Sequence, residues 1–141
     1  MEIIEFRNEL WECFQYLRSS MTHIFGPIVA ESGLTMLQAW ILIEVRTAGK
    51  ATVGELGEVI GSGSGNASTM CKKLEQMGLV YRERAEYDER VVHVSLTDEG
   101  REILGKIEHD IQNRYAKVLA SWPPEDFALI TAGTHKIREI L

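Results

Sequence analysis

The sequence is poor in the residues that mark secreted and metal-binding proteins. It has two cysteines, Cys13 and Cys71, which form neither a zinc-ligand spacing nor a small disulfide scaffold. We expect each to be a reduced, buried small hydrophobe. The four histidines contain no pair at ligand spacing, so we expect no metal and no other cofactor. With three prolines and no low-complexity tract, the 141 residues fit one globular domain, with or without helical extensions.

Long apolar runs are also absent. The longest, around AWILIEV, is broken by Glu44 and is too short to span a bilayer. The first residues, MEIIEFRNELW, carry acids where a signal peptide needs basic residues and a continuous apolar run. These features predict a soluble, cytoplasmic protein without a membrane partner.

A positive net charge, the usual mark of a nucleic-acid-binding protein, is missing as well. The chain holds 15 lysines and arginines against 21 acids, for a net charge of −6. The balance is uneven, because five of those bases and five of those acids lie between Ser62 and Arg90. That segment is neutral and the remainder carries the whole negative charge, which by itself does not decide the class of partner.

What the chain does have is a series of amphipathic helix patterns. Apolar residues recur at steps of three and four over about the first thirty positions, which predicts one long helix. Gly26-Pro27 should kink or interrupt it near its end. Thr35 opens a second helix, and Thr52 with Glu55 has the spacing of a capping box for a short third helix, VGELGEVI.

The fourth predicted helix begins at a cap, Ser64 or Asn66, runs to Met77 and ends at Gly78, where a left-handed residue is needed. One face of this helix is apolar and should contact the core: Ala67, Met70, Cys71, Leu74 and Met77. The other gathers lysines, which can reach phosphates, and small side chains that can reach base edges: Asn66, Ser68, Thr69, Lys72 and Lys73. Any surface helix has a polar face, so the assignment depends on the elements that come next in the chain.

Two strand patterns follow this helix, LVYRER and VVHVSL. They predict an antiparallel hairpin whose strands are joined by AEYDER. Thr97 has the position of an N-cap for a long helix to about Ala120, and a last helix comes after SWPPED. A short helix, a tight turn, a second helix and a hairpin form the winged helix-turn-helix pattern. We therefore expect a mainly α fold with a small β-hairpin wing, in which residues 35–97 are the winged helix-turn-helix domain and the fourth helix is the recognition helix.

The two ends of the chain carry more apolar helical surface than one small domain can cover. We expect residues 1–34 and 98–141 to form a helical dimerisation region, and the protein to be a homodimer.

The charged stretch of the hairpin supplies further candidate contacts. Asp88 and Arg90 are two residues apart, and Arg84 stands across from them on the first strand. Asp88 can hold one arginine while the loop presents the other, and an arginine at a loop tip fits a narrow minor groove. We expect Arg90 to enter such a groove, and Arg82 and Arg84 to contact phosphates. An ordinary charged β-turn would use the same residue types.

The segment LEQMGLVYRERAEYDERVVHVSLTDEG resembles the signature of the MarR family of bacterial winged helix-turn-helix transcriptional regulators. The family has Leu-Glu before Gly-Leu-Val, and Asp-x-Arg followed by Leu-Thr-x-x-Gly. The matching positions are Leu74, Glu75, Gly78, Leu79, Val80, Asp88, Arg90, Leu96, Thr97 and Gly100. LTMLQAWIL, from Leu34, is similar to the family's second helix, so the resemblance covers about residues 34–100.

The resemblance implies a homodimeric regulator rather than an enzyme, usually a repressor, that binds a pseudo-palindromic site in double-stranded DNA and is released by a small-molecule effector. The two recognition helices would enter successive major grooves, and the wing tips would enter the flanking minor grooves. The DNA-binding residues would be Ser64, Asn66, Ser68, Thr69, Lys72, Lys73, Arg82, Arg84, Asp88 and Arg90. Glu89 departs from the family, which often has a second basic residue there, so affinity should depend more on the other bases.

A cavity between the dimerisation helices and the winged domain is where the resemblance places a small aromatic or amphipathic effector. Its candidate lining is Trp11, Phe14, His23, Met36 and Trp40. The same residues fit a plain hydrophobic core equally well.

Cys13 raises an alternative, because some members of the family sense organic peroxides through a first-helix cysteine. Counting back from Met21-Thr22 and Pro27 places Trp11 at that cysteine's position, two residues from Cys13, which favours a packed, unreactive thiol over a redox sensor. An enzyme built on Cys13 has no paired base.

A winged-helix protein-interaction module without DNA binding is another alternative. The acidic balance of the chain and Glu89 favour it, whereas the polar recognition face and Arg90 oppose it.

Overall fold

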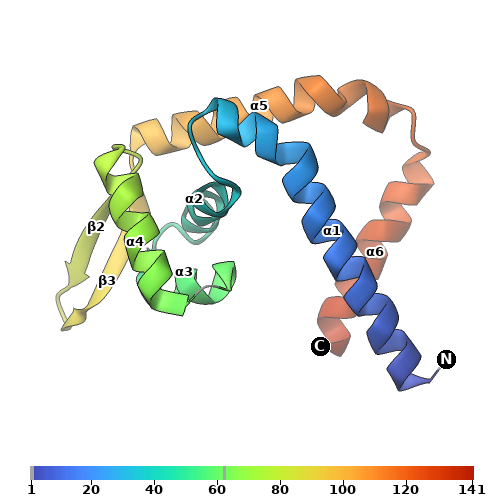
Figure 1. The fold of residues 1–141 in the computed structure, drawn as a ribbon, viewed down its shortest axis with the longest axis horizontal. Coiled ribbons are helices and arrows are strands. Elements are labelled where there is room, and N and C mark those ends of the chain that lie inside the picture. The colour runs from blue at the N-terminus through green and yellow to red at the C-terminus, as the bar shows by residue number, and fades with distance from the viewer. Residues whose placement is uncertain (1, 62) are drawn as a thin grey trace. The chain divides into compact units, whose positions relative to one another are not determined.

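The computed structural model describes residues 2–61 and 63–141, with the side chain of Ser64 outside the description. The elements, in chain order, are α1 (Ile3–Glu31), α2 (Met36–Ala48), β1 (Ala51–Thr52), α3 (Val53–Ile60), α4 (Gly63–Gln76), β2 (Val80–Ala85), β3 (Asp88–Leu96), α5 (Asp98–Ala120) and α6 (Pro124–Ile140), as Figure 1 shows. The chain forms two compact units, Met1–Glu108 and His109–Leu141. The first unit contains the predicted winged helix-turn-helix.

Helix starts agree with the capping signals in the sequence. The side-chain oxygen of Thr35 accepts a hydrogen bond from the backbone N–H of Gln38, and Thr52 does the same for Glu55. Both are complete capping boxes, which satisfy backbone donors that a helix leaves unpaired at its first turn.

Two expectations about helix boundaries were wrong. Of the kink or interruption expected at Gly26-Pro27, the interruption does not occur, because α1 continues to Glu31 with Pro27 inside the helix. The next residues, Ile28 and Val29, are fully buried, so packing compensates for the backbone hydrogen bond that a proline cannot donate.

The second concerns α4, which already begins at Gly63. Asn66 therefore lies in the first turn of the helix and not at its cap. Ser64 shares that turn, and its side chain lies outside the described residues. The end of α4 falls at Gln76, one residue before the predicted Met77, and the left-handed glycine is where it was predicted, since Gly78 adopts φ +77, a conformation that costs glycine little.

The sheet has three antiparallel strands in the order β1-β3-β2. β1 was not expected: it is only two residues long, and its Ala51 pairs with Val94 beside the capping box that opens α3. The hairpin itself is confirmed, but its turn is shorter than AEYDER suggests. Only Glu86 and Tyr87 form the turn, so that Asp88 begins β3, and the ladder is irregular between Arg84 and Ala85.

The core of the first unit lies where α2, α3, α4 and the sheet meet, and Figure 1 shows these elements gathered beside the hairpin. Its fully buried side chains include Ile41, Leu42, Val45, Leu56, Leu74 and Val94. Ala67 and Cys71 of α4 are buried as predicted, whereas Met77 is largely exposed, because it lies beyond the last helical residue and leaves the apolar face.

Apolar side chains stay exposed on the terminal helices. On α1 these include Ile3, Ile4, Trp11, Phe14, Leu17 and Met21, and on α6 Phe127, Leu129, Ile130 and Ile140. No residue within α6, all of which is described, is buried. Among the described residues no single helix is long and apolar enough to cross a membrane, and only α1 together with α2, bent by 85°, meets length and composition limits.

Candidate nucleic-acid interface and effector groove

The outer face of α4 carries the polar side chains that the sequence assigned to it. Asn66, Lys72 and Lys73 are exposed, and Ser68 is half-buried. The hydroxyl of Thr69 donates to the carbonyl oxygen of Gly65 at 3.2 Å, so this side chain offers an outside group mainly its acceptor lone pairs.

A concave surface of about 640 Å³ joins α4 to the hairpin and to the start of α3. It brings together three of the predicted DNA-binding residues, Ser68, Arg82 and Arg90. The rest of its lining was not anticipated: Thr52, Val53, Gly54, Gly65, Tyr87, Val91 and Val92. Of these, Tyr87 had the clearest signal in the sequence, since it is the aromatic residue of the charged segment AEYDER.

Arg82 is committed to a partner within the chain. Its Nε and Nη2 atoms donate to Oε1 of Glu75 at 3.2 and 2.9 Å, and its backbone N–H donates to Oε2 at 3.0 Å. These hydrogen bonds hold the pKa of Glu75 below its ordinary value. Arg82 therefore links β2 to α4 through its ion pair with Glu75. Less of its charge is available to phosphates than the sequence suggested.

Arg90 is the exposed cation of the hairpin tip, with 91% of its side chain accessible. Asp88 accepts from its backbone N–H at 2.9 Å and from Nε at 3.2 Å, and the first of these contacts is the main reason why the pKa of Asp88 is lowered. We expected Asp88 to hold one arginine and the loop to present another. Instead the arginine that Asp88 orients is the one presented, while Arg84 donates to the carbonyl oxygen of Glu89 at 3.0 Å.

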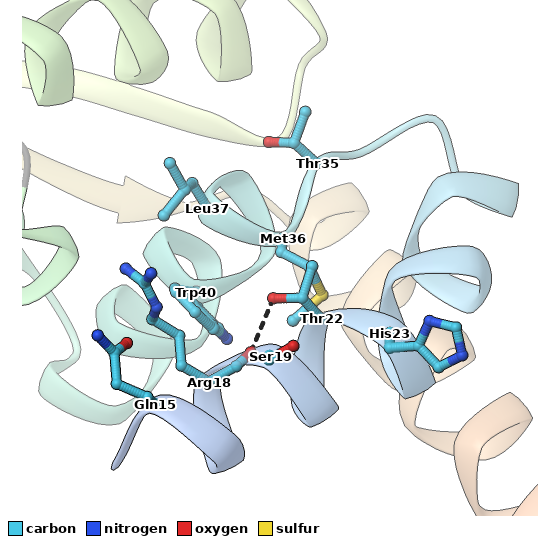
Figure 2. Close-up of a pocket in the computed structure, with 9 residues that line it drawn as sticks. All are labelled: Gln15, Arg18, Ser19, Thr22, His23, Thr35, Met36, Leu37 and Trp40. Carbon is cyan, nitrogen blue, oxygen red and sulfur yellow. Dashed lines mark hydrogen bonds between the residues drawn. The ribbon is translucent and has the colours of Figure 1, made fainter. Parts of the chain in front are cut away.

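A groove of about 670 Å³ lies between α1 and the beginning of α2. It is lined by Gln15, Arg18, Ser19, Thr22, His23, Thr35, Met36, Leu37 and Trp40. Figure 2 shows the side chain of Arg18 rising from α1 toward Leu37 and Trp40, while His23 points away from them. The α1 wall of the groove is polar, and within it Thr22 donates to the carbonyl oxygen of Arg18 at 3.0 Å, whereas the residues from α2 are Met36, Leu37 and Trp40.

Three of the five predicted effector residues, His23, Met36 and Trp40, line this groove. Trp11 and Phe14 do not: they are 60% and 53% exposed and contact each other, with ring centroids 5.9 Å apart. They lie on the N-terminal half of α1, which runs away from α2 in Figure 1. The polar lining was missed, although Gln15, Ser19 and Thr22 have helical spacing on one face of α1.

The two cysteines differ in environment. Cys71 is completely buried, as expected, and burial raises the pKa of its thiol to about 11, which leaves little reactive thiolate at neutral pH. Cys13 is exposed, which corrects the expectation that it is buried, because it lies in a stretch of α1, residues 11–19, whose side chains are all exposed.

Comparison with known families and sequences gives consistent matches. The family described as transcriptional regulator SarA/Rot matches residues 23–107. An organic hydroperoxide resistance transcriptional regulator of Bacillus subtilis is 35% identical over 99 residues, which are 69% of this chain and 66% of that protein. The HTH-type transcriptional regulator SarZ of Staphylococcus epidermidis is 32% identical over 108 residues, 73% of each chain.

Solved structures of transcriptional regulators share the fold. BldR from Sulfolobus solfataricus superposes with a TM-score of 0.78 at 22% identity, covering 100% of both chains. A mutant MarR from E. coli complexed with operator DNA has a TM-score of 0.73 at 20% identity, over 97% of this chain and 99% of that one. NadR in complex with 4-hydroxyphenylacetate gives 0.74 at 22% identity, over 91% of each.

Proposed function

The chain belongs to the SarA/Rot family of transcriptional regulators and has the winged helix-turn-helix fold of the MarR family, and from that premise we propose that it is a cytoplasmic repressor that binds a pseudo-palindromic DNA site as a homodimer and leaves it when a small effector binds. The observation that carries this proposal is the concave surface shared by α4 and the hairpin, which places Ser68 of the recognition helix and the exposed Arg90 on one face.

The side chains on that face divide between the two kinds of contact that a DNA-binding domain needs. Asn66, Ser68 and Thr69 offer hydrogen-bonding groups to base edges in the major groove. Lys72, Lys73 and Arg84 supply the positive charge that meets phosphates. Arg90, oriented by Asp88, enters the flanking minor groove. The mutant MarR of the same fold is bound to operator DNA, which supports this assignment.

Homodimerisation is proposed for residues 1–34 and 98–141, with residues 35–97 as the DNA-binding domain. α1 and α6 each expose large apolar side chains that a monomer would leave in water. A second copy of the chain covers such faces with two-fold symmetry, and it also supplies the second winged domain that a pseudo-palindromic site requires.

The groove between α1 and α2 suits an aromatic molecule that carries an anionic group. Met36, Leu37 and Trp40 provide an apolar wall for a ring, and the guanidinium of Arg18 pairs with a carboxylate. NadR, which shares the fold, is solved with a ligand of that chemistry, 4-hydroxyphenylacetate. An effector that binds more tightly to a dimer whose recognition helices have the wrong separation would shift the population away from DNA.

The experiment that tests the proposal is fluorescence anisotropy of the purified protein on a duplex from upstream of its own gene. A scrambled duplex serves as the control, and both are titrated at several salt concentrations. The proposal requires selective binding whose affinity falls steeply with salt, because lysines and arginines displace counterions from the phosphates. Weak binding, equal on both duplexes and insensitive to salt, would favour the protein-interaction module.

A thiol-based sensor of organic peroxides is a second candidate, favoured by the exposure of Cys13 and by the similarity to the hydroperoxide resistance regulator. The two modes of release differ in what Cys13→Ser does. If cumene hydroperoxide releases the wild-type protein from DNA but not the variant, release occurs through the thiol. If hydroperoxide leaves DNA binding unchanged while an aromatic carboxylate weakens it, the effector groove controls release.

A further inference from the structure

Tyr87 is an exposed aromatic residue at the tip of the hairpin. With Glu86 it forms the turn between β2 and β3, and 77% of its surface is accessible. It also lines the concave surface that contains Ser68 and Arg90. A neutral side chain with a large apolar ring and a hydroxyl therefore faces the same space as the residues proposed to contact DNA.

The position of Tyr87 is held by His93. The two rings meet edge to face, with centroids 6.3 Å apart and planes at 69°, and the hydroxyl lies 3.4 Å from Nε2 of the imidazole. His93 is half-buried in the central strand, paired with Glu83 on one side and Thr52 on the other. Its Nδ1 atom is buried and has no hydrogen-bond partner among residues 2–61 and 63–141. The sheet holds the backbone of His93, and its imidazole is the side chain that the ring and the hydroxyl of Tyr87 both contact.

The charges of the hairpin explain why a neutral contact is useful there. Arg82 is paired with Glu75, and the tip carries the carboxylates of Glu86, Asp88 and Glu89. Arg90 thus approaches the DNA from a tip that is rich in acids. A tyrosine adds affinity without adding charge, because its hydroxyl donates to a phosphate oxygen and its ring packs against a sugar.

We propose that Tyr87 is a second DNA-contacting residue of the wing, beside Arg90, and that His93 is its positioning residue. This inference rests on the proposed DNA-binding function. It predicts a specific difference between the two contacts: loss of Arg90 removes a counterion-releasing charge, whereas loss of Tyr87 removes affinity that does not depend on salt.

The test compares Tyr87→Ala and Arg90→Ala by anisotropy on the duplex from upstream of the gene, across a salt series. We expect Tyr87→Ala to weaken binding about tenfold with an unchanged salt slope, and Arg90→Ala to reduce the slope by about one. Tyr87→Phe separates the hydroxyl from the ring. Tyr81→Ala is the matched control, since Tyr81 is 45% exposed on β2 but does not line the concave surface, and it should bind like the wild type.

His93 is tested by a double-mutant cycle with Tyr87. His93→Ala should weaken DNA binding in the wild-type background and have no further effect in Tyr87→Ala. An equal effect in both backgrounds would show that His93 only supports the sheet, and would overturn its positioning role. Circular dichroism melts of each variant establish that the fold is retained.

Failure of the inference differs from failure of the proposed function. If the wild-type protein binds its duplex selectively and Tyr87→Ala binds equally well, the Tyr87 contact is wrong and the regulator assignment stands. If the wild-type protein shows no selective, salt-dependent binding to that duplex, both are rejected.

Discussion

The arginines of the winged domain differ in how much of their charge is available to a ligand. Arg82 has a quarter of its side chain exposed and shares two hydrogen bonds with one carboxylate oxygen of Glu75. Arg90 has 91% of its side chain exposed and is oriented by Asp88 without being enclosed. A charge count along the sequence treats the two residues alike. Their contacts show that Arg82 stabilises the fold, whereas the charge of Arg90 is accessible at the surface.

Arg90→Ala should therefore weaken DNA binding by about tenfold or more, because an arginine in a narrow minor groove meets concentrated negative potential. Anisotropy titrations at several salt concentrations measure the affinity and its slope. Arg138→Ala is the control, since it removes an equal charge from α6, outside the winged domain. Equal losses from the two variants would refute the role of the wing.

At the scale of elements, two contacts tie the hairpin to the helices on either side of it. The Glu75–Arg82 pair joins α4 to β2. At the other end, the hydroxyl of Thr97 donates to the carbonyl oxygen of Gly78 at 2.6 Å and accepts from the N–H of Gly100 at 3.0 Å, which caps α5. The orientation of the wing relative to the recognition helix depends on both.

Glu75→Gln should lower the free energy of unfolding by about 1 kcal/mol at pH 7, which is the size expected of a partly exposed ion pair with a backbone hydrogen bond. Because Arg82 holds the pKa of Glu75 below its ordinary value of 4.5, the stabilisation is complete above that value. It is lost as the pH falls through the lowered pKa of the folded state. Urea denaturation at pH 7 and at progressively lower pH should show the difference between wild type and variant shrinking; a constant difference would contradict the ion pair.

Gly100 and Gly105 on α5 should respond to alanine in opposite directions. A Cβ at Gly100 would collide with the backbone carbonyl of Leu79, which cannot move without displacing the start of the hairpin, so Gly100→Ala should destabilise by ~3 kcal/mol. A Cβ at Gly105 would meet no atom of residues 2–61 and 63–141 within 4 Å, and alanine is the better helix former, so Gly105→Ala should stabilise by ~0.5–1 kcal/mol. Thermal unfolding of the two variants measures both, and the same sign for each would contradict the close contact at Gly100.

For the whole molecule, the exposed apolar side chains of the terminal helices are the feature that a single chain does not explain. Those on α1 recur at helical spacing, for example at Phe14, Leu17 and Met21, and are at least two-fifths exposed. The proposed dimer buries such a stripe, and each protomer then contributes one winged domain to the DNA site.

Phe14→Glu should weaken the dimer by on the order of a hundredfold in Kd, because it places a charge without a partner in a buried apolar interface. Analytical ultracentrifugation over a range of concentrations measures the shift toward monomer. Tyr16→Glu is the control: Tyr16 is 73% exposed on the same helix but stands off the stripe, so its substitution should leave the dimer intact. A dimer that survives Phe14→Glu unchanged would exclude this face of α1 as the interface.

Local and periodic features of the chain were readable from the sequence alone. The helix start at Thr35, the capping box at Thr52, the left-handed Gly78 and the alternation of Val92, Val94 and Leu96 each depend on neighbours a few residues away. They were sufficient for the order of the helices and the hairpin and for the winged helix-turn-helix, whereas the family came from the resemblance of residues 34–100 to its signature. β1 was not predicted, because a two-residue strand is too short to show an alternation of apolar and polar residues. It is a strand only through its pairing with β3.

The partners of the polar side chains were decided by the tertiary structure. Whether Arg82 is free or braced by Glu75, whether Asp88 holds Arg84 or Arg90, and whether Trp11 reaches the groove all depend on where distant segments lie. The residue type determines which hydrogen bonds a side chain can make. A hydrogen bond also requires a donor and an acceptor about 3 Å apart, and the folded structure sets that distance. The sequence therefore determined the helices, the hairpin and the kind of site, and the packing of α1, α4 and the hairpin determined which of the candidate residues lie together.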